Sequence, residues 1–232
     1  MVSGTKAVLA VDVGGSHVKV LLSGETESRR AVSGPKLTPA QMVAVVTKIA
    51  TGWTWDYVSV GAPAPVRAGS IISEPANLGT GWVGFDFAAA FGKPTKIVND
   101  AAMQALGSYE GGRMLFLGLG TGLGSAMIVD GIVEPMELAH LPFKKRTYED
   151  YVGQRGLDRL GKKRWRASVA QALEQLTAAL EPDTLVIGGG NAVNLKELPA
   201  NARLGANENA FTGGFRLWET DAPSVAHPER TS

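Results

Sequence analysis

Residues 115–129 read LFLGLGTGLGSAMIV, a stretch in which alternating glycines separate two apolar runs. The apolar runs predict strands over residues 114–117 and 125–129, joined by a glycine loop over residues 118–124. The loop differs from a Walker loop, because no Gly-Lys-Ser/Thr follows, and from the dinucleotide fingerprint, because strand-like residues follow it. A flexible hairpin loop without a ligand does not require so many glycines. The pattern therefore favours a phosphate-binding loop that includes Gly120, Thr121 and Gly122.

An earlier stretch of the chain repeats this pattern. Residues 9–22 read LAVDVGGSHVKVLL, again two apolar runs around a glycine turn, with a small hydroxyl residue, Ser16, beside the turn. Helices and further strands are expected after each hairpin. The twofold repeat predicts two similar lobes that face each other across a cleft, with residues 1–110 in the first lobe and residues 111–232 in the second.

The remaining segments alternate between strand and helix patterns. Thr38-Pro39 is typical of a helix start, and apolar residues at spacings of three and four follow it. Such alternation is typical of an α/β protein. The predicted strands cover residues 27–32, 57–61, 66–72, 95–98 and 184–187, and the predicted helices cover residues 85–91, 100–109 and 147–180, the last with a break near Gly161. From about Asp221 the chain is polar and is expected to fray.

The first glycine turn carries candidate residues for binding an anion. The backbone amides of Gly14, Gly15 and Ser16 can converge on an anion, and Lys19 follows in the next strand. Asp12, which ends the first strand, can hold a divalent cation such as Mg²⁺. The alternative is an ordinary hairpin in which Asp12 caps the turn.

The pair Asn99-Asp100 follows a predicted strand and opens a predicted helix. A carboxylate at the end of a strand can project into a cleft and accept the proton of an attacking hydroxyl. Asn and Asp are also preferred N-cap residues, so a structural role at the helix start is the alternative.

Two further groups are candidates for ligand binding. Glu137 and His140 lie three residues apart and can share one face of a turn, where they can bind vicinal hydroxyls. Nothing nearby supplies further ligands at a suitable spacing, so no zinc site is expected. Gly188, Gly189 and Gly190 follow the last predicted strand, where they either let a flat ring or a phosphate approach the backbone or form a plain strand-to-helix turn.

The composition excludes several classes of function. The 232 residues include no cysteine, which excludes disulfides, thiolate metal sites and a cysteine nucleophile, and which fits the cytoplasm. Residues 114–129 are uncharged but glycine-rich, so no membrane span is expected. The net charge of +1 indicates no nucleic-acid partner. Residues 144–166, however, hold nine basic and three acidic residues, a local charge of +6 that suits either a solvated helix face or a site for a polyanion.

Taken in order, these segments resemble the ROK family of sugar kinases from about residue 9 to residue 191. The segments DVGGSHVK and GLGTGLGS resemble the family's two phosphate loops, and IGGG resembles its adenosine-side glycines. The run GAP at residues 61–63, with the pairs NL at 77–78 and GW at 81–82, resembles its sugar-side loops. Asn99-Asp100 resembles its catalytic element, and ELAH at residues 137–140 resembles its Glu-x-Gly-His element. Within the family, the short chain, the Glu-Leu-x-His-Leu run and the basic helical segment are similar to the polyphosphate glucokinases.

The resemblance implies an actin-like/hexokinase-like fold, which is a duplicated, ribonuclease H-like, two-lobed α/β ATPase fold with an interlobe cleft. It implies that Asp100 is the catalytic base and that the sugar is bound by Asn77, Asn99, Glu137 and His140. It further implies Mg²⁺, a donor that is ATP or inorganic polyphosphate, a homodimer, and a reaction that converts glucose to glucose 6-phosphate. Residues 1–6 leave no room for the DNA-binding domain of the family's repressors.

Two positions depart from the family's pattern. Ala64 and Ala139 stand where the family has glycine, and each adds a methyl group beside the expected sugar pocket. Two alternatives therefore stay open, a kinase for another sugar or amino sugar and a sugar-binding sensor without catalysis.

Overall fold

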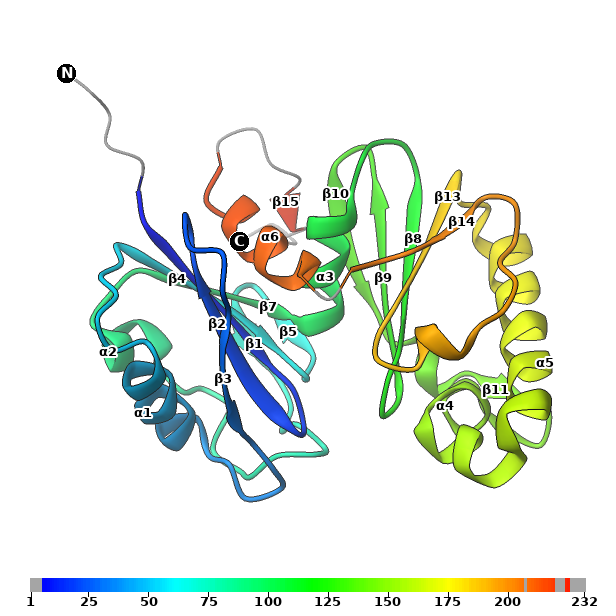
Figure 1. The fold of residues 1–232 in the computed structure, drawn as a ribbon, viewed down its shortest axis with the longest axis horizontal. Helices are drawn as coiled ribbons and strands as arrows, with labels where there is room; N and C mark the ends of the chain where they lie inside the picture. Colours follow the sequence, from blue (N-terminus) through cyan, green and yellow to red (C-terminus); the bar gives the residue numbers. More distant parts are fainter. Residues whose placement is uncertain (1–5, 207, 220–223, 226–232) are drawn as a thin grey trace, which may run out of the picture.

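The computed structural model, which describes residues 6–206, 208–219 and 224–225, contains two mixed β-sheets that stand side by side (Figure 1). The first sheet has the strand order β3-β2-β1-β4-β7. Strands β1, β2 and β3 are antiparallel neighbours, whereas β1, β4 and β7 run parallel. The strands of this sheet are β1 (Val8–Val13), β2 (His17–Leu22), β3 (Arg29–Val32), β4 (Tyr57–Ala62) and β7 (Thr95–Asn99).

The second sheet repeats the first. Its order is β14-β13-β8-β9-β10-β15, and the part from β10 to β14 has the same order and strand directions as the first sheet from β3 to β7. The strands are β8 (Met114–Leu119), β9 (Leu123–Val129), β10 (Ile132–Met136), β13 (Thr184–Gly188), β14 (Ala202–Leu204) and β15 (Ser224–Val225). The predicted twofold repeat is therefore confirmed. The sequence predicted that the tail frays from about residue 221. In that stretch β15 pairs with β10, and the other residues lie outside the described ranges.

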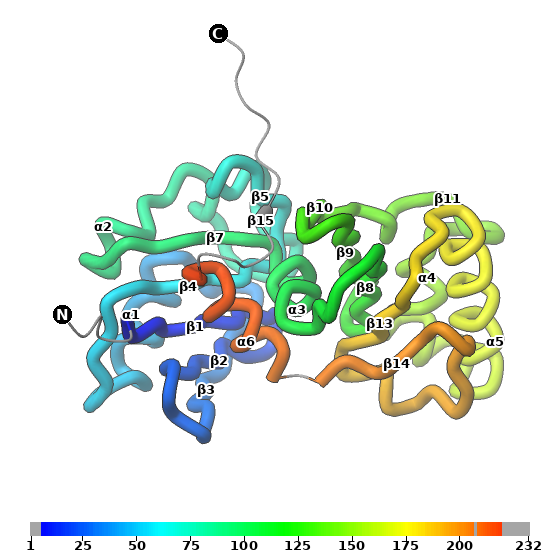
Figure 2. The backbone as a smooth tube through the Cα atoms, turned by 90° about the horizontal axis from the view of Figure 1, so that it is seen from above, coloured from blue at the N-terminus to red at the C-terminus, as the bar shows by residue number. Residues whose placement is uncertain are grey.

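Helices cover the outer face of each sheet and lie between the two sheets (Figures 1 and 2). The outer helices are α1 (Pro39–Ile49) and α2 (Phe87–Phe91) on the first sheet, and α4 (Tyr148–Val152) and α5 (Gln154–Leu180) on the second. A fully buried tryptophan, Trp82 or Trp165, belongs to each outer core. None of the helices in the described ranges is long and apolar enough to cross a bilayer.

The helices α3 (Asp100–Ser108) and α6 (Asn209–Arg216) cross closely between the sheets. Glycine permits this crossing, because a Cβ on Gly107 would lie 1.8 Å from the Asn209 carbonyl oxygen and one on Gly213 would lie 1.8 Å from that of Met103. A third hydrophobic core joins α3 to β8, β9 and α6. The chain therefore returns from the second sheet to the first: the Ser59 hydroxyl of β4 donates to the carbonyl of Gly214 in α6 (2.6 Å).

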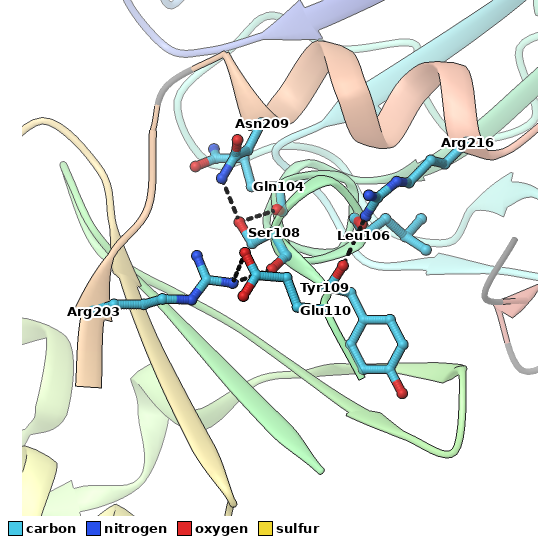
Figure 3. A network of polar contacts seen from close by, with 8 residues as sticks. All are labelled: Gln104, Leu106, Ser108, Tyr109, Glu110, Arg203, Asn209 and Arg216. Atoms are coloured by element: carbon cyan, nitrogen blue, oxygen red, sulfur yellow. Dashed lines mark hydrogen bonds and ion pairs between the residues drawn. The ribbon is translucent and has the colours of Figure 1, made fainter. Parts of the chain in front are cut away.

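Polar side chains fix the C-terminal end of α3, where its last carbonyl groups lack helical partners (Figure 3). Arg216 of α6 donates to the carbonyls of Leu106 (2.7 Å) and Tyr109 (2.9 Å). Arg203 of β14 donates to the carbonyl of Ser108 and forms an ion pair with Glu110 (3.1 Å). Segments from both halves of the chain thus meet at this helix end. The division of the chain at residue 110 into two lobes remains a proposal.

Three sequence predictions differ in detail from the structure. The glycine loop is shorter than expected, because β8 reaches Leu119 and Gly118 pairs with Gly124 in the ladder. Gly124 suits the close packing of α3, because a Cβ at this position would lie 3.0 Å from the Cβ of Ala101. Residues 66–72 form two short strands, β5 (Val66–Arg67) and β6 (Ser70–Ile71), around a left-handed turn instead of one strand. Residues 147–180 form α4 and α5, and the break near Gly161 is confirmed by its non-helical φ of 70°.

Candidate active site

The parallel strands of the first sheet bring candidate residues to one edge. Asp12 of β1 pairs with Gly61 of β4, and Ala62 of β4 pairs with Asn99 of β7. Because the carboxyl ends of parallel strands meet at the same edge, Asp12 lies near Asp100, the residue that follows β7. The two carboxyl groups are close enough for Asp12 to raise the pKa of Asp100.

The first glycine turn joins β1 to β2. The backbone N–H of Gly14 donates across the turn (2.9 Å), and Ser16 is exposed beside it. Asp12 is buried, and Lys19 Nζ lies 3.4 Å from its Oδ2 atom. Burial raises the pKa of Asp12, and the Lys19 ammonium offsets part of this rise. The turn therefore combines exposed backbone with a buried carboxylate and a cation.

The second glycine turn, between β8 and β9, is held from the side of α5. The backbone N–H of Gln154 donates to the carbonyls of Gly120 (2.9 Å) and Thr121 (3.2 Å), and the N–H of Gly120 donates to Gly122 (3.2 Å). A Cβ on Gly120 would meet no atom within 4 Å. Packing of the fold therefore does not require glycine at position 120, and the open space there leaves room for a ligand.

Asn99 has the helix-capping role that the sequence offered as the alternative to a role in catalysis. It is the N-cap of α3, where its Oδ1 accepts from the N–H groups of Ala101 (2.9 Å) and Ala102 (3.2 Å). Its Nδ2 donates to the carbonyl of Ala64 (3.2 Å), which leaves one Nδ2 hydrogen for a ligand. The buried methyl group of Ala64 belongs to the hydrophobic core on the outer face of the first sheet.

Asp100 begins α3 and has the properties of a base that works near neutral pH. Burial raises the pKa of Asp100 to about 7, and the negative charges of Asp12 and Glu137 contribute to this rise. The backbone N–H of Ala101, which donates to the Asp100 carboxylate (2.9 Å), lowers the pKa in part. Gly61 packs beside it, since a Cβ on Gly61 would lie 3.4 Å from the Cα of Asp100. A carboxyl group with a strongly shifted pKa is a candidate catalytic group.

Glu137 and His140 are brought together by the short helix η1 (Leu138–His140). His140 Nε2 lies 3.9 Å from Glu137 Oε2, and both side chains are largely exposed, so this ion pair adds little to stability. Burial of the carboxyl group raises the pKa of Glu137, His140 lowers it, and Glu149 raises it. Both side chains are therefore free to contact a ligand. The methyl group of Ala139, between them in sequence, is buried in the second core.

Asn77 lies next to the first glycine turn. A Cβ on Gly15 would lie 3.3 Å from the Cβ of Asn77, and the Asn77 side chain is exposed. The loop that carries Asn77 thus adjoins the turn that contains candidate donor-binding residues.

The three glycines after β13 differ in their surroundings. A Cβ on Gly188 would lie 2.8 Å from the ring of Phe116, and one on Gly189 would lie 2.4 Å from the Leu119 carbonyl oxygen. Gly189 also has a φ of +83°. Close packing therefore requires the first two glycines, whereas a Cβ on Gly190 would meet no atom within 4 Å, which leaves this position open to a ligand.

The structure adds Glu149, which the sequence analysis did not select. A Cβ on Gly122 would lie 2.7 Å from Glu149 Oε2, and Glu149 is close enough to Glu137 to raise its pKa. No signal in the sequence marks this residue, because Glu149 lies in the first turn of α4, next to the capping box of Thr147 and Asp150, where an acidic residue is common in any helix.

Asp12 is the candidate ligand for a divalent cation. Within the described ranges, no group of three or more His, Asp or Glu side chains is placed to hold a metal ion. Mg²⁺ is usually held by one or two carboxylates together with water and substrate phosphates. A single carboxylate beside an open glycine turn fits a Mg²⁺ ion that arrives with a phosphate ligand.

Comparison with known proteins places these features in a family. Residues 8–135, more than half of the chain, match the model of the ROK family. A glucokinase from Pyrobaculum calidifontis is 24% identical in an alignment that covers 80% of this chain and 80% of the relative. A polyphosphate glucokinase from Mycobacterium tuberculosis is 27% identical in an alignment that covers 78% of this chain and 76% of the relative.

Solved structures show the same fold. The inorganic polyphosphate/ATP-glucomannokinase from Arthrobacter sp. strain KM has a TM-score of 0.79 at 24% identity, over 91% of this chain and 97% of that chain. A ROK family glucokinase from Streptomyces griseus, in complex with glucose and AMPPNP, has a TM-score of 0.72 at 15% identity, over 91% of this chain and 98% of that chain. The predicted actin-like/hexokinase-like fold is confirmed.

Proposed function

Because this chain belongs to the ROK family, we propose that it is a sugar kinase that transfers a phosphoryl group from polyphosphate, ATP or both to the 6-hydroxyl of glucose. The relatives named glucokinase and polyphosphate glucokinase support this class of reaction. The observation that carries the proposal is the carboxyl group of Asp100, with a pKa of about 7, beside Asp12 at the start of α3.

In the proposed mechanism, Asp100 is the general base. As the sugar oxygen attacks the terminal phosphorus, an O–P bond forms, the bond to the donor's bridging oxygen breaks, and the hydroxyl proton passes to Asp100. With a pKa of about 7, roughly half of Asp100 is ionised and able to accept a proton at pH 7. Catalysis otherwise comes from positioning and from stabilisation of charge.

The two glycine turns are proposed to bind the donor's phosphates. The first turn provides the amides of Gly15 and Ser16 and the Lys19 ammonium, and the second provides those of Thr121 and Gly122. Gly14 and Gly120 shape these turns, because their own N–H groups donate within them. The turn after β13 adds Gly188, Gly189 and Gly190, of which Gly190 is open. Asp12 would hold Mg²⁺ there, and the ion would offset the charge of the phosphates.

The sugar is proposed to lie against Asp100. Glu137 and His140 have exposed polar groups for its hydroxyls, and Asn99 keeps one free Nδ2 hydrogen. Asn77 and Glu149 complete the proposed set, one beside each glycine turn. Carboxylates and amides that accept and donate to vicinal hydroxyls are the groups such a substrate needs.

The basic segment, residues 144–166, supports polyphosphate as a donor. Lys144, Arg159 and Arg166 bind other parts of the protein. The other six basic side chains are exposed and have no hydrogen bond or ion pair with the described part of the chain; they are Lys145, Arg146, Arg155, Lys162, Lys163 and Arg164. ATP needs fewer cations, so an excess of unpaired positive charge favours a longer polyanion.

The first test is a coupled assay for glucose 6-phosphate with glucose and Mg²⁺, run in parallel with ATP and with inorganic polyphosphate. Product from at least one donor is the expected result, and the comparison identifies the donor. Absence of product with both donors, together with saturable glucose binding, would favour the sugar-binding sensor. Absence of product and of glucose binding would favour a different acceptor, such as an amino sugar.

A homodimer and a cytoplasmic location also belong to the proposal. The family resemblance implies the homodimer, and light scattering after size-exclusion chromatography tests it. A mass near 24.3 kDa, that of one chain, would contradict the dimer.

A further inference from the structure

Each glycine turn has one carbonyl group that a polar side chain outside the turn holds in place. We infer that Ser33 and Asn191 are positioning residues, which orient the peptide groups of the two turns so that the amides of Gly15 and Thr121 point toward the donor's phosphates. This inference rests on the proposed function, because it takes the donor to lie against both turns.

Ser33 fixes the first turn from the end of β3. Its hydroxyl donates to the carbonyl of Gly14, and its backbone N–H donates to the carbonyl of Ser16 (2.9 Å). Both bonds reach the turn from the same residue, so Ser33 fixes two of its carbonyl groups together.

Asn191 fixes the second turn from the segment that follows β13. Its Nδ2 donates to the carbonyl of Gly120 (3.1 Å) and to Oε1 of Gln154 (3.1 Å), and its backbone N–H donates to the carbonyl of Leu119 (2.9 Å). The Gln154 backbone N–H donates to the same Gly120 carbonyl (2.9 Å). Asn191 thus joins three elements, namely the β8–β9 turn, the start of α5 and the turn after β13.

The geometry of the peptide bond links these carbonyls to the amides. In a trans peptide, the C=O of one residue and the N–H of the next point in opposite directions. With the Gly14 carbonyl turned to Ser33, the N–H of Gly15 points away from Ser33. In the same way, the N–H of Thr121 points away from Asn191 and α5. Within the described residues, neither amide donates to a protein group, so both are available to an anion.

Glycine makes such bracing necessary. A glycine turn can rotate its peptide groups at little steric cost, so an unbraced turn can present either a carbonyl or an amide to the cleft. A carbonyl in that place would repel a phosphate, whereas an amide would bind it. Ser33 and Asn191 select the second arrangement before the donor binds, which removes a cost of ordering from the binding step.

The kinetic test uses Ser33→Ala and Asn191→Ala. Each variant is expected to raise the KM for the donor about five- to tenfold, as the loss of about one net hydrogen bond predicts. The KM for glucose should stay within about twofold. Ser33→Thr keeps the hydroxyl and should restore the donor KM. An unchanged donor KM, or an equal rise in both KM values, would overturn the inference.

Matched controls are available in the same segments. Ser23 accepts from Val8 at the opposite end of the β1–β2 hairpin (3.0 Å), and Asn201, just before β14, donates to the carbonyl of Pro182 (3.2 Å). Ser23→Ala and Asn201→Ala should leave the donor KM within about twofold. A rise in the controls equal to that in the test variants would show that the effect is general loosening.

A second measurement does not depend on catalysis. In ¹⁵N-labelled protein, titration with Mg²⁺ and inorganic tripolyphosphate should shift the amide resonances of Gly15 and Thr121. Ser33→Ala should reduce the first shift and Asn191→Ala the second. If the wild type lacks kinase activity but both amides respond in this way, the proposed function fails and the inference stands. If the enzyme is active and neither amide responds, the inference fails and the proposed function stands.

Discussion

Replacement of Asp100 by asparagine is expected to lower activity and raise stability at the same time. The asparagine has almost the same shape but cannot accept the hydroxyl proton, so kcat/KM should fall about 10²- to 10⁴-fold. Glucose binding should change little, because the contacts proposed for the sugar's other hydroxyls remain. In the wild type, kcat/KM should rise about tenfold between pH 6 and pH 8, since a base with a pKa of about 7 becomes ionised in this window.

The effect on stability follows from the raised pKa of Asp100, from 3.8 to about 7. Between these values the folded state holds a proton that the unfolded chain has lost. The contribution of Asp100 to stability is therefore fully present below about pH 3.8 and is lost as the pH rises to about 7. Between pH 5 and pH 8 the loss is roughly 2.5 kcal/mol, at about 1.4 kcal/mol per pH unit up to the folded pKa.

Urea unfolding of both proteins at pH 5 and pH 8 measures this difference. The Asp100→Asn variant should gain roughly 2.5 kcal/mol relative to the wild type on going from pH 5 to pH 8. Asp130→Asn is the matched control, because it makes the same change in the exposed, left-handed turn between β9 and β10, where asparagine is tolerated. It should alter neither activity nor the pH dependence. Near-normal turnover of Asp100→Asn, or an unfolding free energy that responds to pH as in the wild type, would refute the reasoning.

Three further predictions concern the supporting structure. Arg216→Ala removes two hydrogen bonds at the end of α3 and, among the described residues, leaves the Tyr109 carbonyl without a partner, so chemical denaturation should show a loss of about 2–4 kcal/mol, and Arg216→Lys should lose less. Gly189→Ala should destabilise the fold strongly, because Gly189 has a positive φ and contacts β8. Gly190→Ala should fold normally and raise only the donor KM. Equal shifts of the melting temperature in the two variants would contradict this prediction. The double variant Lys162→Ala/Lys163→Ala should raise the KM for polyphosphate, weaken its salt dependence and leave the KM for ATP unchanged, in the coupled assay at two salt concentrations.

The sequence predicted best where local chemistry determines structure. The two hairpins, the strand before Asn99-Asp100 and the break at Gly161 follow from apolar runs and from glycine positions. The same reasoning made the second glycine loop too long, because it treated every glycine as a turn residue. Gly118 and Gly124 are in strands, and Gly124 is small because α3 packs against it. A contact between elements far apart in sequence decides that identity.

The rest of the site depends on contacts of this kind. Glu149 enters the proposed site because α4 places it against the β8–β9 turn, and Asn191 enters the inference because its side chain donates to the Gly120 carbonyl. Neither position has an unusual local pattern. The sequence also gives no local signal that α6 packs back on the first sheet, since Gly213 is glycine because of its contact with α3. Such residues are recognised only when both partners are known.

One helix connects the proposed chemistry to the joint between the two sheets. Asp100 is the first residue of α3, and the carbonyls held by Arg203 and Arg216 lie at its other end. Nine residues of helix span about 13 Å, so a tilt of about 10° about the C-terminal end moves Asp100 by about 2 Å. An error of about 1 Å in a catalytic group can lower the rate about 100-fold. Arg216→Ala is therefore expected to lower kcat as well as stability, because the loss of its two bonds lets α3 tilt and carry the proposed base away from the sugar hydroxyl.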